Sequence, residues 1–159
     1  MNEQWEVIEI SEMQVVGVNT TTSNEVEATE QGRIVPLHRE FIEQNLSDLI
    51  QSDDKRIFAV YDQYSDLEHG EYRYFIGHCA ETIPEGLSAV VIPKGRYLRF
   101  SSERGILSDI LPEAWKNIWR LTSDPNFEYS RSFELDFEFH NYESSDSLDA
   151  QVEIYLSID

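Results

Sequence analysis

Apolar and polar residues alternate strictly along Ser132–His140, the run SFELDFEFH. Such alternation predicts a β-strand with one apolar and one polar face, because successive side chains of a strand point to opposite sides. The apolar face would carry Phe133, Leu135, Phe137 and Phe139, and the polar face Glu134, Asp136, Glu138 and His140. A second alternating run, Gln151–Ile158, places Glu153 and Tyr155 on its polar side. Paired as an antiparallel hairpin, the two runs would bury one face and gather carboxylates beside an aromatic ring on the other.

The rest of the chain divides into further short strands and two helices. Strand-like runs lie at Gln4–Ile10, Met13–Thr22, Arg56–Asp62, Gly70–Ala80, Leu87–Pro93 and Arg96–Ser101. Apolar residues recur at helical spacing over about 34–51 and about 108–121. Pro112 is expected in the first turn of the second helix, because deeper in a helix it would remove a backbone hydrogen bond. The polar segment Ser23–Gln31 has no period and is predicted to be a loop.

The element order β-β-α-β-β occurs twice, with the join near Pro84. The pattern predicts one α+β domain over 1–159, with pseudo-repeats at about 1–82 and 83–159. Both helices should lie on the same side of a shared, largely antiparallel sheet.

Composition narrows the class of protein. The chain of 159 residues has 40% hydrophobic residues, which indicates an ordered globular domain. The single Cys79 suggests a reducing compartment, and no signal sequence or apolar run of bilayer length is evident, so a cytoplasmic location is expected. The net charge of −19 disfavours direct binding to nucleic acid or to anionic lipid.

Patterns typical of catalytic or metal sites are not evident. The four histidines (His38, His69, His78 and His140) lack ligand spacing, and there is no glycine-rich phosphate loop, GxSxG or CxxC. We therefore expect no cofactor, no metal and no catalytic residue. Hydrolysis by a water held between Glu134 and Glu153 stays open as an alternative.

Several segments in order resemble the GyrI-like small-molecule-binding proteins, whose fold is shared by effector-binding domains of AraC-type and MerR-type multidrug regulators. They are PEGLSAVVIPKGRYLRFSS from Pro84, the helix with AWKNIW, the pair Phe133-Glu134 and the final VEIYLSI. The resemblance implies two β-α-β-β modules related by a pseudo-twofold axis, with a ligand cleft between them. It also implies a lipophilic, often cationic, ligand held between aromatic walls over an acidic residue. Matched to this sequence, that acid is Glu134, with Glu153 as a second candidate. Asp136 stands where relatives often carry Tyr.

Aromatic residues supply candidate walls for such a cleft. Trp115 and Trp119 share one helical face, and either both pack in the core or Trp119 edges the cleft. The other candidates lie on predicted strands: Tyr61, Tyr72, Tyr74, Tyr97 and Tyr155. Tyr72 should share the environment of Tyr74. A cation above a buried carboxylate would restore solvation lost on burial and gain roughly 0.5–2 kcal/mol from each aromatic face.

The resemblance predicts a small-molecule-binding protein, which would sense, sequester or deliver its ligand. Only a few residues precede the first predicted strand, so no helix-turn-helix or winged DNA-binding module is expected. Two alternatives remain. The acidic surface could engage a protein partner such as DNA gyrase or a transcription regulator, as the gyrase inhibitors of the family do. Some relatives are instead credited with hydrolysing strained, DNA-alkylating natural products.

Overall fold

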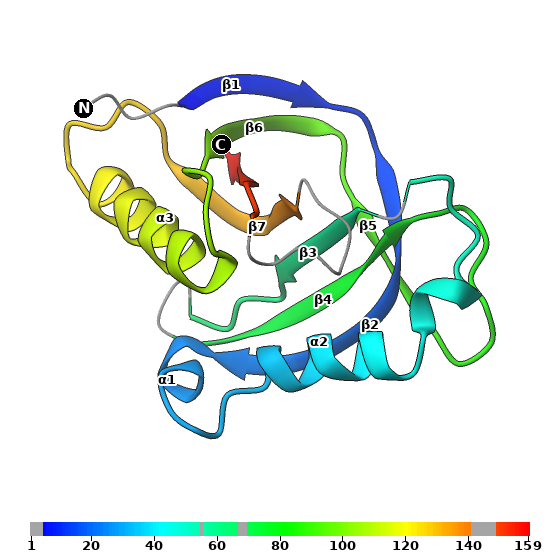
Figure 1. The fold of residues 1–159 in the computed structure, drawn as a ribbon. Coiled ribbons are helices and arrows are strands. Elements are labelled where there is room, and N and C mark those ends of the chain that lie inside the picture. The colour runs from blue at the N-terminus through cyan, green and yellow to red at the C-terminus, as the bar shows by residue number, and fades with distance from the viewer. Residues whose placement is uncertain (1–4, 55, 67–69, 141–148) are drawn as a thin grey trace.

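The computed structural model describes residues 5–54, 56–66, 70–140 and 149–159, so Gln4 and His69 of the predictions lie outside it. Eight strands and three α-helices follow one another along this part of the chain (Figure 1). The strands are β1 (Trp5–Ile10), β2 (Met13–Ser23), β3 (Ile57–Asp62), β4 (Glu71–Cys79), β5 (Ser88–Ile92), β6 (Gly95–Ser101), β7 (Arg131–His140) and β8 (Val152–Ile158). The helices are α1 (Asn24–Glu27), α2 (Ile34–Glu43), the 3-10 turn η1 (Leu46–Leu49) and α3 (Leu107–Thr122).

The strands form one sheet in the order β1-β6-β8-β7-β3-β4-β2-β5, and every neighbouring pair is antiparallel. The predicted α+β class and the β7–β8 hairpin are therefore confirmed. The sheet is strongly curved, because two short links connect its opposite ends (Figure 1). In the strand order β1 and β6 stand at one end and β2 and β5 at the other, and the links join β1 to β2 and β5 to β6. Where β2 and β4 come closest, a Cβ on Gly17 would lie 1.8 Å from the Ile76 carbonyl oxygen, so only glycine fits at this approach.

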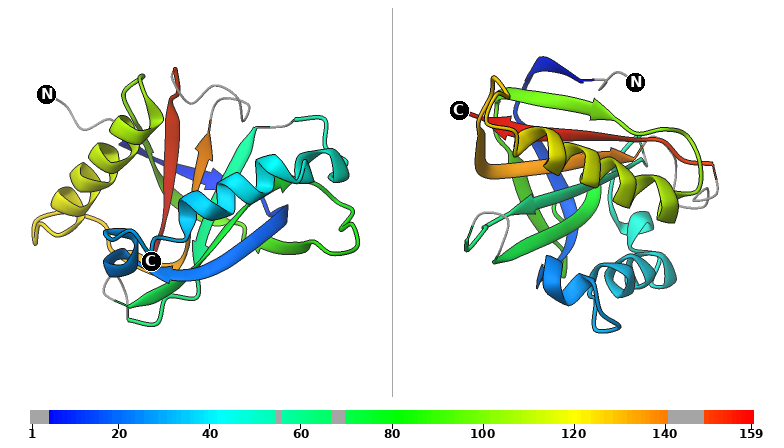
Figure 2. Two further views of the ribbon diagram at one scale, coloured as in Figure 1. Left: turned by 60° about the horizontal axis from the view of Figure 1, so that its bottom comes forward. Right: turned by 90° about the vertical axis from the view of Figure 1, so that its left-hand side faces the viewer.

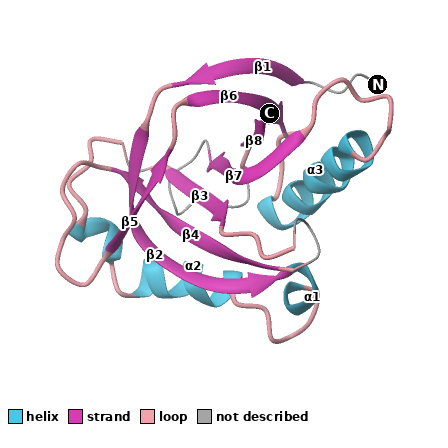
Figure 3. Ribbon diagram, turned by 180° about the vertical axis from the view of Figure 1, so that it is seen from behind, coloured by secondary structure: helices cyan, strands magenta, loops and turns pink. Residues whose placement is uncertain are grey.

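Both long helices pack against the same face of the sheet. Register places Tyr61 of β3, Asp136 of β7 and Leu156 of β8 in one row on that face. At one end of the row α2 covers β2, β3 and β4 through Leu37 and Phe41. At the other end α3 covers β6 and β8 through Ile118. The two helices lie over different strands (Figures 2 and 3), so the centre of the face, at β3 and β7, lies between them.

The opposite face encloses a separate apolar core, whose rings come from several strands. Phe137 and Tyr155 stack at 4.4 Å between ring centroids, and Tyr97 meets Phe137 edge-on at 5.5 Å. Val15, Val60, Phe75 and Leu135 complete its centre. The alternation of β7 and β8 thus separates two cores rather than a core from solvent.

Three local predictions were wrong. The first long helix ends at Glu43, because Asn45 adopts a left-handed conformation (φ 52°) before the 3-10 turn. The segment predicted as a loop contains α1, whose first turn is capped by Ser23 Oγ accepting from the Val26 N–H at 3.2 Å. Helix α3 begins at Leu107, so Pro112 lies in its second turn. No helix within the described ranges is long and apolar enough to cross a membrane.

Strand β7 is irregular near its start. Phe133 has φ of 55°, and the pairing register with β8 shifts between Arg131 and Asp136. Such an irregularity re-aims side chains on the bulged strand. Regular alternation therefore holds from Leu135 to His140 but not across Glu134.

Candidate ligand-binding site

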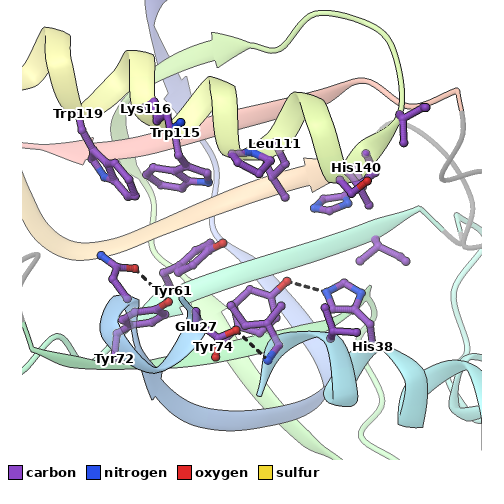
Figure 4. Close-up of a pocket in the computed structure, with 18 of the residues that line it drawn as sticks. Glu27, His38, Tyr61, Tyr72, Tyr74, Leu111, Trp115, Lys116, Trp119 and His140 are labelled. Carbon is purple, nitrogen blue, oxygen red and sulfur yellow. Dashed lines mark hydrogen bonds between the residues drawn. The ribbon is translucent and has the colours of Figure 1, made fainter. Parts of the chain in front are cut away.

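A cavity of about 810 Å³ lies between α2 and α3, above β3, β4 and β7 (Figure 4). Its volume is within the range of pockets that hold drug-sized molecules. Its lining is largely aromatic and aliphatic. Its aromatic and charged or polar lining includes Glu27, His38, Tyr61, Tyr64, Tyr72, Tyr74, Trp115, Lys116, Trp119, Arg131 and His140.

Aromatic rings form two opposing walls of the cavity. Trp115 and Trp119 project from α3 with ring centroids 6.0 Å apart (Figure 4). Tyr61 lies below them, 5.5 Å from Trp115 and 5.1 Å from Tyr74, and it also contacts Tyr72 at 5.5 Å. Flat rings held this closely by one another present a preformed apolar surface to a ligand.

The lower wall, formed by Tyr61, Tyr72 and Tyr74, is the aromatic floor of the cavity. A buried carboxyl group lies beneath it. Glu138 of β7 has no exposed surface, although it is an acidic residue in the middle of the sheet. Its Oε2 accepts hydrogen bonds from Tyr61 Oη at 2.6 Å and Trp115 Nε1 at 2.7 Å. Its Oε1 accepts from His140 Nε2 at 2.8 Å. All three donors line the cavity, so Glu138 is separated from it by a single layer of side chains.

These donors keep Glu138 ionised. Burial by itself raises the pKa of this carboxyl, but the hydrogen bond and positive charge of His140, with the hydrogen bonds of Tyr61 and Trp115, hold the pKa below its ordinary value. Burial and the nearby Glu138 charge raise the pKa of Tyr61 far above that of a free phenol. Tyr61, in the floor, is therefore a neutral phenol that donates a hydrogen bond to the Glu138 anion.

His38 of α2 faces His140 across the cavity, with ring centroids 6.4 Å apart. Its Nε2 shares a hydrogen bond with Tyr74 Oη at 2.7 Å. Burial first, and then the charge of His140, lower the pKa of His38 to about 4 despite the opposing effect of Glu138. His38 is consequently neutral near pH 7.

A second buried carboxylate, Asp136, lies on the same face and has a permanent partner. Arg131 Nη2 approaches Asp136 Oδ2 at 2.6 Å, with side chains 7% and 0% exposed. Tyr64 Oη donates to the same oxygen at 2.5 Å, and the Ser157 N–H donates to Oδ1 at 3.0 Å. The pair is neutral as a unit, and the hydrogen bonds that Asp136 accepts fix the start of β7.

A third carboxylate, Glu27, serves the backbone of α2. The capping residue Arg33 makes no side-chain cap, and Glu27 instead accepts from the N–H groups of Arg33 and Ile34 at 2.7 and 3.3 Å. Negative charge at a helix N-terminus is favourable. Glu27 therefore positions α2 at the cavity while keeping its charge near Tyr72.

Three predicted site residues lie on the cavity face. Tyr74 and Trp119 line the cavity, and Asp136 is buried beside its Arg131 end. Trp119 contacts the cavity, and Tyr72 packs in the same cluster as Tyr74. A ligand-binding role for Trp119 and Tyr74 stays a prediction.

The other four predicted residues are not brought to the cavity. Glu153, Tyr97 and Tyr155 lie on the opposite face, where Tyr155 Oη donates to Glu153 Oε1 at 2.9 Å. Glu134 is exposed, because the irregularity at Phe133 removes it from the alternating run. Their placement in a cleft is corrected accordingly, since β8 presents Val152, Ile154 and Leu156, not Glu153, to the helix side.

Sequence reasoning missed the acid at the centre of the site. Glu138 shares the polar face predicted for Ser132–His140 with Asp136 and His140, but the resemblance assigned the ligand-binding acid to Glu134. Its position in the sequence could have indicated burial. Glu138 lies in the middle of the last long strand pair, and two helices on one side of a sheet cover the residues at its centre. No group of three or more potential metal ligands occurs among the residues that the structure describes.

Fold and cavity together define a small-molecule-binding domain of the effector-binding type. The chain belongs to the family described as integron-associated effector binding protein, Cass2, whose profile matches residues 6–158. The resemblance to the GyrI-like proteins is thereby confirmed. YobU of Bacillus subtilis (strain 168), provisionally named a transcriptional regulator, is 33% identical over 147 residues, which cover 89% of each chain.

Solved structures share the fold at lower identity. The integron cassette protein VCH_CASS2 from the mobile metagenome of Vibrio cholerae has a TM-score of 0.78 at 19% identity, covering 98% of this chain and 95% of that one. SAV2435 bound to tetraphenylphosphonium has a TM-score of 0.76 at 15% identity, covering 98% and 94%. The C-terminal domain of EcmrR has a TM-score of 0.65 at 16% identity, covering 100% and 99%.

Proposed function

We propose that this protein binds lipophilic cations in the cavity between α2 and α3, with the charge of Glu138 as the main electrostatic determinant. The observation that carries the proposal is a fully buried carboxyl group, Glu138, directly beneath an aromatic cavity. The expected effect of ligand binding is regulatory, not catalytic, in keeping with an effector-binding family.

The physical argument concerns desolvation. A carboxylate removed from water is costly to keep ionised, and hydrogen bonds offset only part of that cost. A delocalised cation in the cavity interacts with Glu138 through a floor of low dielectric constant, where charges interact more strongly than in water. The faces of Trp115, Trp119 and Tyr61 add cation–π attraction, while their size suits an apolar ligand surface.

The relatives support the same class of ligand and role. SAV2435 is described in complex with tetraphenylphosphonium, a lipophilic cation. YobU and EcmrR connect the fold with transcriptional regulation. We propose that this chain likewise responds to such a ligand and passes the signal to a regulatory partner. Direct contact with duplex DNA is not expected, because the net charge of −19 opposes phosphate binding.

The test is titration of tetraphenylphosphonium into the wild type and Glu138→Gln, followed by calorimetry and by tryptophan fluorescence. The substitution keeps the side-chain shape and removes the charge, so we expect affinity to fall by more than about tenfold. Glu134→Gln is the matched control: it removes an equal charge from an exposed position and should change affinity less than about twofold. Equal affinities for wild type and Glu138→Gln would exclude Glu138 and leave Glu27 as the carboxylate to test.

A further inference from the structure

The two buried carboxylates of β7 have partners of different kinds. Asp136 pairs with Arg131 and Glu138 pairs with His140, at 2.6 and 2.8 Å, and all four side chains are at least nine-tenths buried. An arginine does not lose its proton in proteins. A histidine can do so within the physiological range. Of these two pairs, only the one beneath the aromatic floor can therefore exchange its cation.

This difference matters when a cationic ligand arrives. While His140 is protonated, Glu138 and His140 together are neutral, and an added cation would bring uncompensated positive charge into a buried site. Loss of one proton from His140 restores neutrality, because the ligand then becomes the counter-ion of Glu138. The Nε2–H hydrogen bond to Glu138 can persist, since the proton released is the one on Nδ1.

Several described groups around His140 are poor acceptors for its proton. From α2, His38 faces it, and that imidazole has its pKa lowered to about 4 by burial and by the His140 charge. Tyr61 of β3 and Tyr74 of β4 are phenols, with partners in Glu138 and His38. Opposite His140, β3 and β8 present Ile57 and Val152, which are apolar. Among the residues that the structure describes, the remaining charged groups of the cavity are Lys116 of α3, Glu27, and Arg131 with its partner Asp136.

We propose that His140 is the resident counter-ion of the site and determines its specificity, so that a cation binds by displacing one proton. This inference rests on the proposed function. It makes two predictions: cation affinity rises with pH, by up to about tenfold per unit while His140 is protonated, and neutral ligands of the same shape show no such dependence.

The experiment is calorimetric titration of the wild type with tetraphenylphosphonium, from about pH 5 to about pH 8, in two buffers of different ionisation enthalpy. The buffer difference measures protons released per ligand, and we expect a value approaching one at the acidic end. Triphenylphosphine oxide, a neutral analogue, should release none. His140→Gln retains a donor toward Glu138 without a titratable charge. Because burial then raises the pKa of Glu138, this variant is compared with the wild type at the alkaline end of the range, where it should bind the cation about as tightly as the wild type and release no proton. His38→Gln should keep the proton release, whatever it does to affinity.

The outcomes separate this inference from the proposed function. In one outcome the cation binds in a Glu138-dependent way, but no proton is released and the affinity does not change with pH. This result would overturn the role of His140 and leave the proposed function standing. Equal pH dependence for the neutral analogue would also overturn it, because the cavity itself would then respond to pH. No binding of the cation at any pH would reject both. Should His140→Gln fold poorly, the proton count on the wild type decides alone.

Discussion

The indole N–H of Trp115 donates a hydrogen bond to Glu138 Oε2 at 2.7 Å, and this contact joins helix α3 to the centre of the sheet. Trp115 also packs edge-on against Tyr61, which donates to the same oxygen. Glu138 Oε2 is therefore held by donors from two elements, α3 and β3. The aromatic wall and the buried acid form one unit, so a substitution in either should affect the other.

Trp115→Phe tests this unit. Phenylalanine keeps most of the ring contact but cannot donate, so Glu138 keeps only two of its three side-chain donors. Hydrogen bonds to charged groups contribute about 1.5–3 kcal/mol. We expect a loss of this size in the free energy of unfolding at pH 7, measured by urea denaturation. The loss should shrink in acid, once Glu138 becomes protonated, because a neutral acceptor binds the indole less strongly.

Trp119→Phe is the matched control. Trp119 lies one turn further along α3 and is 36% exposed, and it packs on Trp115 without donating to Glu138. We expect its substitution to cost less than about 1 kcal/mol. Equal losses for the two variants, or a Trp115→Phe loss that does not depend on pH, would show that packing alone accounts for the effect.

Asp136→Asn should lower the free energy of unfolding strongly, although the two side chains have nearly the same shape. The substitution leaves Arg131 buried without its countercharge, and breaking one side of a buried ion pair costs about 3–5 kcal/mol. Glu134→Gln, two residues earlier on the same strand, should stay within about 0.5 kcal/mol because Glu134 is exposed. Chemical denaturation of both variants at pH 7 makes the comparison. A small effect of Asp136→Asn would mean that Arg131 finds compensation elsewhere.

The sheet and its hairpin could be predicted because their signal is local. Alternation along β7 and β8 follows directly from the twofold repeat of a strand, and the repeated element order indicated two helices over one sheet. The helix end at Glu43 was missed because a left-handed asparagine can break an amphipathic pattern without changing its apolar spacing. Such a break depends on tertiary packing of Leu46 and Ile50, which a periodicity does not encode.

The site was harder to predict because it depends on which residue of a correct strand lies beneath the helices. The polar face of β7 was identified, but the irregularity at Phe133 moved the buried acid from Glu134 to Glu138. Alternation also cannot show that the second face of a strand is buried. Here the curved sheet encloses one core and the helices cover another, so Tyr97 and Tyr155 occupy the former and Tyr61 and Tyr74 the latter.

Tyrosine ionisation reports on both cores at once. The chain has eight tyrosines, and among those that the structure describes five have raised pKa values: Tyr61, Tyr64, Tyr72, Tyr97 and Tyr155. Burial is the largest cause in each, and nearby carboxylates add to it, which raises the pKa of Tyr97 and of Tyr155 to about 12. In the unfolded chain all phenols titrate near pH 10. The native protein should therefore ionise no more than three of its eight tyrosines by about pH 11.

The same shifts set the direction of alkaline stability. Above about pH 10 the unfolded chain loses phenolic protons that the folded chain retains, so the folded state binds more protons and the free energy of unfolding falls as pH rises. This contribution is fully present below about pH 10 and is lost as pH rises through the folded pKa values. Absorbance at 295 nm would count the ionised phenols, circular dichroism would follow the fold, and a sample in concentrated guanidinium chloride would give the full count of eight. Reversible ionisation of more than three phenols by about pH 11, with the fold intact, would contradict the burial of these hydroxyl groups.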